Sequence, residues 1–516
     1  MRDFMFSCGA VSAKRQSMLI FGATVLALSM FLAPQHAAAQ TAGKTIADWW
    51  EAAYLQNARC GYVHTKIEEL DQGGVKILRS AIEFRLNVKR NNDVIQLAMD
   101  SGTFEFPDGK VFGTFMRQFQ GRNQVVEITG VVDGSQITLT RNKTQPISPA
   151  PWDPQVLGVY KQKTLFQDQK IKSGDAFSYK SFEPTINLVA NTLVNVKDYE
   201  DVELFAGKQK KHLLRVEAKA EKIGTFQLPP YTAWLDESLL PLRAEFEVPG
   251  IGKVVLYQTT KAFASAPATA APPLDVGISH YVRLNRKIIR PHETATAVYR
   301  ITIKDEDDVA SAFARDGRQE IKNIKGNTLE LHVHADSGGD AAEKPSAEFT
   351  QSSYFVTSDD AKVQELAHQA VGTEKEPWKK ALKIEKWVNA HMRVTNREGL
   401  APADRVARTL EGDCTEFAML TAAMCRAEGI PSRTAMGLIY ADVRTGPVFA
   451  FHMWTEVWID GRWRSLDATL GQGGIGAVHL KISDQSWHDD RALTPLLPVA
   501  RVLGKLAIDV VRVEGR

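Results

Sequence analysis

Cysteine and net charge are both scarce in this sequence, and each shortage excludes a class of protein. The chain of 516 residues contains four cysteines. Cys8 lies in the leader described below, and the remaining three form an odd, sparse set that argues against a disulfide framework. With 63 basic and 61 acidic residues the formal net charge is +2. This balance gives no indication of a nucleic-acid partner or an acidic tail.

Long apolar runs are also few, and the clearest is near the N-terminus. Basic Arg2, Lys14 and Arg15 precede an apolar run over residues 18–33, which is followed by Ala37-Ala38-Ala39. This pattern is typical of a secretory signal peptide, and it predicts cleavage after residues 1–39. The alternative is an uncleaved anchor, but the run is shorter than the ~20 residues that a spanning helix needs. We therefore expect a periplasmic or secreted protein with no stable membrane span after cleavage.

The length predicts two to four domains. Residues 45–262 are expected to form an all-β N-terminal domain, because strand-like stretches alternate there with turn signals. A short helical piece is predicted at its start, over residues 46–54. The turn signals are Gly73-Gly74, Asp108-Gly109, Asp133-Gly134 and Ala206-Gly207. This spacing indicates an antiparallel meander or half-barrel.

Three further segments follow. Residues 263–276 are rich in alanine and proline and read as a linker. Residues 277–345 hold strand-like runs, which predict a small β domain or an extension of the next one. They include His332 and His334 on one strand face, but without a visible third ligand we expect a solvent-facing pair rather than a metal site. Residues 350–516 are expected to form the last domain, whose tail is either strand or helix.

One cysteine begins a helix with both ends marked. Asp413 is a favourable N-cap residue, while Gly429 and Pro431 mark the other end. Cys414 then lies in the first turn, where unpaired N–H groups and the helix dipole favour a thiolate. Cys425 lies eleven residues further along the same helix, about 16 Å away, too far for a disulfide bond. Cys414 therefore remains free to act as a nucleophile, although a lone cysteine is more often a small buried apolar residue.

A predicted hairpin supplies partners for this cysteine. Asp460-Gly461 is flanked by two runs rich in aromatic and β-branched residues, which indicates a two-residue type I′ turn. Counting outward from that turn places His452 and Asp467 on one face as diagonal neighbours. Taken singly, each is better explained as a structural residue. Cys414, His452 and Asp467 together form a nucleophile, a base and a group that orients the base.

These residues lie within a longer pattern that resembles the transglutaminase-like superfamily of papain-like cysteine enzymes. The matching blocks, all in order, are Gly412-Asp413-Cys414, then Arg426-Ala427-Glu428-Gly429-Ile430-Pro431-Ser432-Arg433, then His452-Met453-Trp454-Thr455-Glu456-Val457, and finally Trp463-Arg464-Ser465-Leu466-Asp467. The resemblance covers roughly residues 350 to 480. It implies an α+β papain-like C-terminal domain, with its nucleophile helix on an antiparallel sheet, and a catalytic triad of Cys414, His452 and Asp467.

The expected chemistry is acyl transfer without a metal or organic cofactor, most readily hydrolysis of a peptide or amide bond in a protein or peptide substrate. Two alternatives stay open: a cross-linking transglutaminase, and a non-catalytic binding protein on the same scaffold. Trp454 and Trp463 share the hairpin face with His452 and Asp467, and are predicted to contact substrate. A glycine-rich loop over residues 471–474 is a candidate lid. No pattern in the sequence specifies an oligomeric state.

Overall fold

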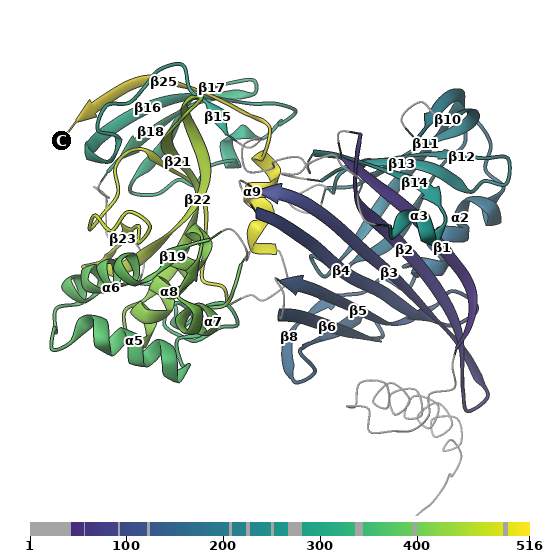
Figure 1. Ribbon diagram of the computed structural model, residues 1–516, viewed down its shortest axis with the longest axis horizontal. Helices are drawn as coiled ribbons and strands as arrows, with labels where there is room; N and C mark the ends of the chain where they lie inside the picture. The colour runs from purple at the N-terminus through teal and green to yellow at the C-terminus, as the bar shows by residue number, and fades with distance from the viewer. Residues whose placement is uncertain are drawn as a thin grey trace, which may run out of the picture.

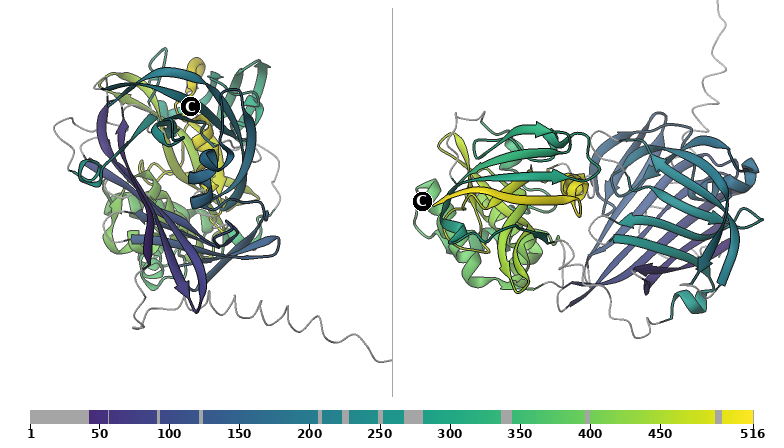
Figure 2. Two further views of the ribbon diagram at one scale, coloured as in Figure 1. Left: turned by 90° about the vertical axis from the view of Figure 1, so that its right-hand side faces the viewer. Right: turned by 90° about the horizontal axis from the view of Figure 1, so that it is seen from above.

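The computed structural model describes residues 43–515 except 56, 91–92, 121–123, 206–208, 223–227, 249–251, 267–280, 336–343, 396–399 and 489–493. It contains two units side by side, a curved all-β unit and a mixed α+β unit (Figures 1 and 2). The predicted leader over residues 1–39 and most of the predicted linker over 263–276 lie outside the described residues. Among the described helices, none is long and apolar enough to cross a membrane.

The N-terminal unit is a 14-stranded antiparallel sheet, as the alternating pattern predicted. Its strands run in the order β8-β7-β6-β5-β4-β3-β2-β1-β14-β13-β12-β11-β10-β9. The bounds are β1 Lys44–Leu55, β2 Ala58–Gln72, β3 Val75–Arg90, β4 Asp93–Glu105, β5 Val111–Gln120, β6 Gln124–Asp133, β7 Gln136–Arg141, β8 Gln145–Pro151, β9 Ala176–Glu183, β10 Leu188–Leu204, β11 Gln209–Ala220, β12 Tyr231–Leu235, β13 Pro241–Val248 and β14 Gly252–Thr259. The sheet curls strongly (Figure 2), and a bridge between Val156 and Lys180 links the segment after β8 to the edge strand β9.

The helix predicted over residues 46–54 is wrong, because this segment is strand β1. Its apolar residues fit a helical spacing, but β1 pairs with β2 on one side and β14 on the other. Two ladders of backbone hydrogen bonds and burial of Ala52, Ala53 and Leu55 outweigh a weak local preference.

In the described part of this unit there are two helices, α2 (Val159–Gln169) and the short α3 (Lys261–Ala264). The buried carboxylate of Glu105 accepts hydrogen bonds from Ser80 Oγ at 2.8 Å, Thr103 Oγ1 at 2.9 Å and the backbone N–H of Tyr160 at 3.0 Å. A carboxylate at a helix start satisfies an unpaired N–H and favours the dipole. Glu105 therefore fixes α2 against the sheet.

The C-terminal unit contains a helical layer on an antiparallel sheet, the arrangement that the sequence predicted. The sheet runs β15-β22-β21-β24, with β23 paired to β22. Its strands are β15 Val282–Arg283, β21 Ser432–Val443, β22 Gly446–Ile459, β23 Arg462–Leu466 and β24 His479–Gln485. The helices are α5 Ala361–Val371, α6 Pro377–His391, α7 Ala403–Thr409 and α8 Cys414–Ala427, accompanied by the short parallel pair β19 Arg393–Val394 and β20 Glu411–Gly412. Helix α8 is buried nearly all round, between the other helices and strands β21 and β22.

A second, four-stranded sheet joins the segment before this layer to the end of the chain. Its order is β17-β18-β16-β25, with β16 Thr294–Ile303, β17 Gln319–Lys325, β18 Thr328–His334 and β25 Leu506–Gly515. The tail thus contains both helix α9 (Leu497–Val502) and a strand. Short 3-10 turns lie at η1 Pro291–Glu293, η2 Val309–Ser311, η3 Ala347–Phe349 and η4 Thr494–Leu496. One apolar core joins this sheet to buried residues of β21, β22 and β24.

The two units contact each other where the helical layer begins. The guanidinium of buried Arg141 at the end of β7 lies 4.6 Å from the ring centre of Tyr354. Tyr354 also packs on the apolar core between β5 and β8. A cation over an aromatic face, packed against apolar side chains, gives the units a specific contact.

Candidate active site

Helix α8 begins with a complete capping box. Asp413 Oδ1 accepts the backbone N–H of Thr415 at 2.9 Å, and Glu416 Oε2 accepts the backbone N–H of Asp413 at 2.9 Å. Asp413 is therefore the N-cap that the sequence predicted, and Cys414 is the first helical residue. Burial, together with the neighbouring Asp413 charge, raises the pKa of Glu416 to about 8. A largely protonated Glu416 adds little negative charge beside the thiol at neutral pH.

Of the cysteines in the described ranges, only Cys414 is accessible. Cys425 is 0% exposed and Cys60 is 5% exposed, and none of the three forms a disulfide. Burial raises the pKa of the Cys60 thiol to about 11, and burial raises that of Cys425 further. Both are consequently poor nucleophiles.

The hairpin of β22 and β23 has the predicted register. Asp460 and Gly461 both have positive φ, 54° and 76°, as a type I′ turn requires. Ile459 faces Arg462, and the ladder continues to Thr455 opposite Leu466. Just beyond it, His452 Nε2 lies 2.8 Å from Asp467 Oδ2.

The His452 ring is bound on both sides. Its Nε2 is occupied by Asp467, so Nδ1 is left for the hydrogen bond with the Cys414 side chain. Burial would lower the pKa of His452, but the charges of Asp467 and Cys414 and the hydrogen bonds to both raise it well above 6.5. Burial likewise acts to raise the pKa of Asp467, and the His452 charge with the His452 and His479 hydrogen bonds holds it well below 3.8. The electrostatics favour a protonated imidazole beside an ionised carboxylate.

Asp467 is fixed by more than the histidine. Its Oδ1 accepts Thr469 N at 2.9 Å and Thr469 Oγ1 at 2.5 Å. Its backbone N–H donates to Glu385 Oε1 at 3.1 Å, and Glu385 Oε2 accepts the N–H of Gly473 at 2.9 Å. Asn389, one turn along α6, donates to the carbonyl of Ala468 at 2.9 Å. Helix α6 therefore holds both the backbone of Asp467 and the loop that the sequence marked as a candidate lid.

The structure adds a second histidine. His479 Nε2 lies 3.1 Å from Asp467 Oδ2, and the ring is fully buried. Within the described residues, His452, Asp467 and His479 are the one group whose potential ligand atoms lie within 4.8 Å of one another. Both histidine nitrogens already hydrogen-bond to Asp467 Oδ2, so we assign the three residues to a hydrogen-bonded group rather than to a metal.

The two tryptophans predicted to contact substrate differ in their exposure. Trp454 is 1% exposed and packs beneath the site, with its ring centre 5.3 Å from that of His479. Trp463 stacks under Arg433, whose guanidinium is 4.0 Å from the ring centre. It lies four residues from Asp467 along the hairpin, about 13 Å away. Trp454 thus packs against the ring of His479, and Trp463 lies near the turn of the hairpin.

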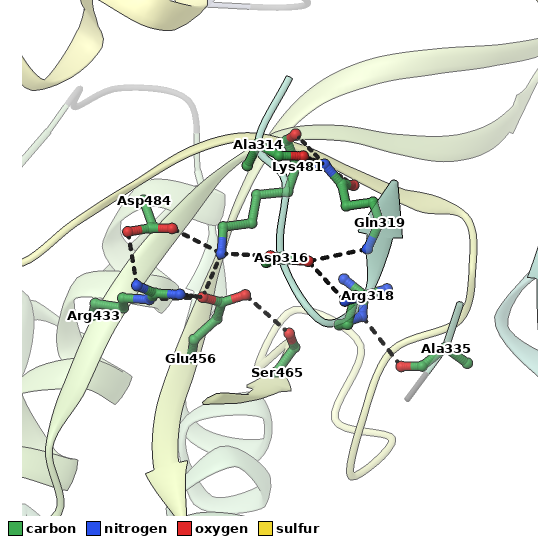
Figure 3. Close-up of polar contacts among 10 residues, drawn as sticks. All are labelled: Ala314, Asp316, Arg318, Gln319, Ala335, Arg433, Glu456, Ser465, Lys481 and Asp484. Atoms are coloured by element: carbon green, nitrogen blue, oxygen red, sulfur yellow. Dashed lines mark hydrogen bonds and ion pairs between the residues drawn. The ribbon is translucent and has the colours of Figure 1, made fainter. Parts of the chain in front are cut away.

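A buried ion cluster braces the same sheet face (Figure 3). Lys481 Nζ lies 2.9 Å from Asp316, 2.8 Å from Glu456 and 2.8 Å from Asp484. Arg433 bridges Glu456 and Asp484, at 2.8 and 2.9 Å. Burial would raise the pKa of Glu456, but the Lys481 and Arg433 charges lower it to about 2. Since Glu456 follows His452 on β22 and Lys481 follows His479 on β24, the cluster fixes the spacing of the strands that hold both histidines.

The structure thus brings together Cys414, His452 and Asp467, buries Trp454 and leaves Trp463 partly exposed. Sequence reasoning missed Glu385 and His479. Glu385 had one usable signal, an acidic residue at a core position of an amphipathic helix. His479 had none, because no local turn relates β24 to the hairpin.

Comparison with known proteins agrees with the resemblance in the sequence. Residues 364–468 match the sequence profile of the Transglutaminase-like superfamily. Human kyphoscoliosis peptidase is 30% identical over 92 residues, which is 17% of this chain and 14% of the length of that protein. The mouse protein of the same name is 33% identical over the same shares.

Among solved structures, a beta-barrel-like protein of unknown function from Brucella abortus aligns with 42% of this chain and 98% of its own, at 13% identity and a TM-score of 0.30. The periplasmic domain of TgpA from Pseudomonas aeruginosa aligns with 35% of this chain and 91% of its own, at 14% identity and a TM-score of 0.25.

Proposed function

We propose, from the premise that residues 364–468 form a transglutaminase-like domain, that the protein is an exported cysteine hydrolase of peptide or amide bonds. The observation that carries the proposal is one continuous contact: Cys414 at a capped helix start, His452 hydrogen-bonded to it, and Asp467 Oδ2 at 2.8 Å from His452 Nε2. A nucleophile, a base and an orienting carboxylate in this order activate a thiol for acyl transfer.

The first half of the reaction forms a thioester. His452 takes the Cys414 proton, and the thiolate attacks the carbonyl carbon of the substrate. The resulting oxyanion is stabilised by backbone N–H groups at the start of α8, where that of Cys414 is the leading candidate. Collapse of the intermediate breaks the C–N bond, and the His452 imidazolium protonates the departing amine.

The second half returns the enzyme to its starting state. His452 takes a proton from water, the hydroxide attacks the thioester carbonyl, and the C–S bond breaks. The products are the free acid and the Cys414 thiol, which regains its proton from His452. Throughout, Asp467 holds the ring and stabilises the imidazolium without itself being protonated, in accord with its lowered pKa.

Hydrolysis is favoured over transfer to an amine by the surroundings of the hairpin. A transferase needs a dry, largely apolar approach that admits an amine and excludes water. Trp454 is 1% exposed, so its ring offers almost no surface to such an approach. Water is therefore expected to reach the thioester.

The test is mass spectrometry of a peptide library incubated with purified protein, with and without a millimolar primary amine. We expect free acid in both arms, and none with Cys414→Ala. An amine adduct in excess of the acid would identify a cross-linking transferase. No acid and no adduct from the wild-type protein would favour a binding scaffold.

Export is the second part of the proposal, and the leader over residues 1–39 supports it. The mature protein should begin at Gln40 and lie in the periplasm or the medium. N-terminal sequencing of the protein from the cell envelope tests this. Retention of residues 1–39 would identify an anchored protein instead.

A further inference from the structure

Two imidazoles face one carboxylate oxygen. His452 Nε2 and His479 Nε2 lie 2.8 and 3.1 Å from the same atom, Asp467 Oδ2. The two ring centres are 6.0 Å apart in an edge-on arrangement. The function proposed above uses His452 and leaves His479 without a role.

The proton positions follow from the chemistry of the acceptor. An ionised carboxylate only accepts hydrogen bonds, so each nitrogen that faces Oδ2 must carry a hydrogen. Burial lowers the pKa of His479 to about 4, although Asp467 opposes this. His479 is therefore neutral near pH 7, with its one proton on Nε2. Its Nδ1 is buried and has no hydrogen-bond partner among the described residues.

His479 is not needed to orient the carboxylate. Thr469 already holds Oδ1 through its N–H and its hydroxyl, and Glu385 holds the backbone N–H of Asp467. What His479 adds is a second donor on the oxygen that binds His452. Two donors on one oxygen share its charge, so each is held less strongly than it would be alone.

We propose that His479 is a positioning residue of this site, whose Nε2–H shares Asp467 Oδ2 with His452 and so limits how firmly Asp467 holds the His452 proton. This inference rests on the proposed function in assigning His452 as the base. A base that must release its proton to the leaving amine works best when its conjugate acid is not over-stabilised. The other titratable or charged groups that face these three residues are Cys414, Glu385, His292 and Arg318.

Two substitutions separate this role from a purely structural one. His479→Phe keeps a buried aromatic ring but removes the donor, so Asp467 Oδ2 faces His452 alone. The Cys414–His452 ion pair should then persist to higher pH, by about one pH unit. His479→Gln keeps an N–H near the position of Nε2 and should restore the wild-type profile.

The measurement is the rate of Cys414 alkylation by iodoacetamide between pH 5 and pH 10, followed by intact mass for the full-length wild type and both variants. This readout needs no substrate. In the plot of alkylation rate against pH, we expect the change on the alkaline side to occur at higher pH in His479→Phe than in the wild type. In His479→Gln it should return to the wild-type pH. Superimposable profiles, or equal shifts in both variants, would overturn the proposal. A shift in a protein that turns over no peptide would uphold the role of His479 and reject the proposed hydrolase.

A second measurement does not depend on the folding of a variant. Nitrogen-15 chemical shifts of the histidines in the wild-type protein report which ring nitrogens carry hydrogen. At pH 7 we expect His479 to be neutral with its proton on Nε2. A doubly protonated His479, or one protonated on Nδ1 alone, would contradict the inference.

Discussion

The side chain of Glu385 binds the backbone of Asp467, since the Asp467 N–H donates to Glu385 Oε1 at 3.1 Å. A buried carboxyl on α6 thus fixes the backbone just after β23, where Asp467 lies. Burial raises the pKa of Glu385 to about 7, against the two backbone N–H groups that lower it. The support of the site therefore titrates close to neutral pH.

The first prediction concerns stability and pH. The folded protein keeps the Glu385 proton up to about pH 7, whereas the unfolded chain releases it near pH 4.5. Between these values the folded state binds more protons, so this group lowers the free energy of unfolding as pH rises, by ~3 kcal/mol at most. Urea unfolding at pH 5 and pH 8 should show a smaller difference in Glu385→Gln than in wild type. The matched control is Glu365→Gln, at an exposed position of α5, which should keep the wild-type difference.

The second prediction concerns thiol reactivity. At pH 7 a thiol reagent should modify Cys414 at least about tenfold faster than Cys60 or Cys425, because those two are buried with raised pKa values. Peptide mapping after brief labelling gives the order, and Cys414→Ser should remove the fast phase. Faster labelling of either other cysteine would exclude Cys414 as the nucleophile.

The third prediction tests whether the negative charge of Asp467 is needed in addition to the position of its side chain. Asp467→Asn should lower kcat/KM by up to ~10⁴, as in comparable serine triads, because an amide cannot stabilise the imidazolium. An amide also offers one acceptor oxygen to four donors, so the melting temperature should fall as well. Asp509→Asn, at an exposed position of β25, is the matched control. Full activity in Asp467→Asn would mean that another group orients His452.

The fourth prediction concerns the ion cluster of Figure 3. Lys481→Met removes the cation shared by Asp316, Glu456 and Asp484, and should cost about 3–5 kcal/mol of unfolding free energy. The control is Arg300→Ala, which removes an exposed ion pair with Glu330 and should cost no more than about 1 kcal/mol. Chemical unfolding of both variants measures the difference. Equal effects would show that Lys481 contributes no more than a surface charge.

Local signals predicted the parts of the site that local structure determines. Asp413 satisfies the first N–H groups of α8, and the Asp460-Gly461 turn fixes which residues of the hairpin face each other. Both are relations between residues close in sequence, which a capping pattern or a two-residue turn specifies fully. The His452–Asp467 contact follows from the register alone.

Relations between distant segments could not be predicted in this way. Glu385 reaches Asp467 across 82 residues, and His479 lies on a strand that pairs with β21 rather than with the hairpin. The prediction of a helix over residues 46–54 was wrong for a related reason, because two neighbouring strands impose the strand conformation there. In each case tertiary packing determines the contact or the conformation, and the local sequence carries little information about that packing.

The pairing of β16 with β25 has a consequence for how the protein is made. Strand β16 begins at Thr294 and its partner begins at Leu506, so Cys414, His452 and Asp467 are all synthesised between them. A chain that ends before β25 would therefore leave one edge of β16 unpaired although Cys414, His452 and Asp467 are all present. A chain truncated before Leu506 should therefore hold Cys414 on an incomplete support, and the proposed activity should require the last strand.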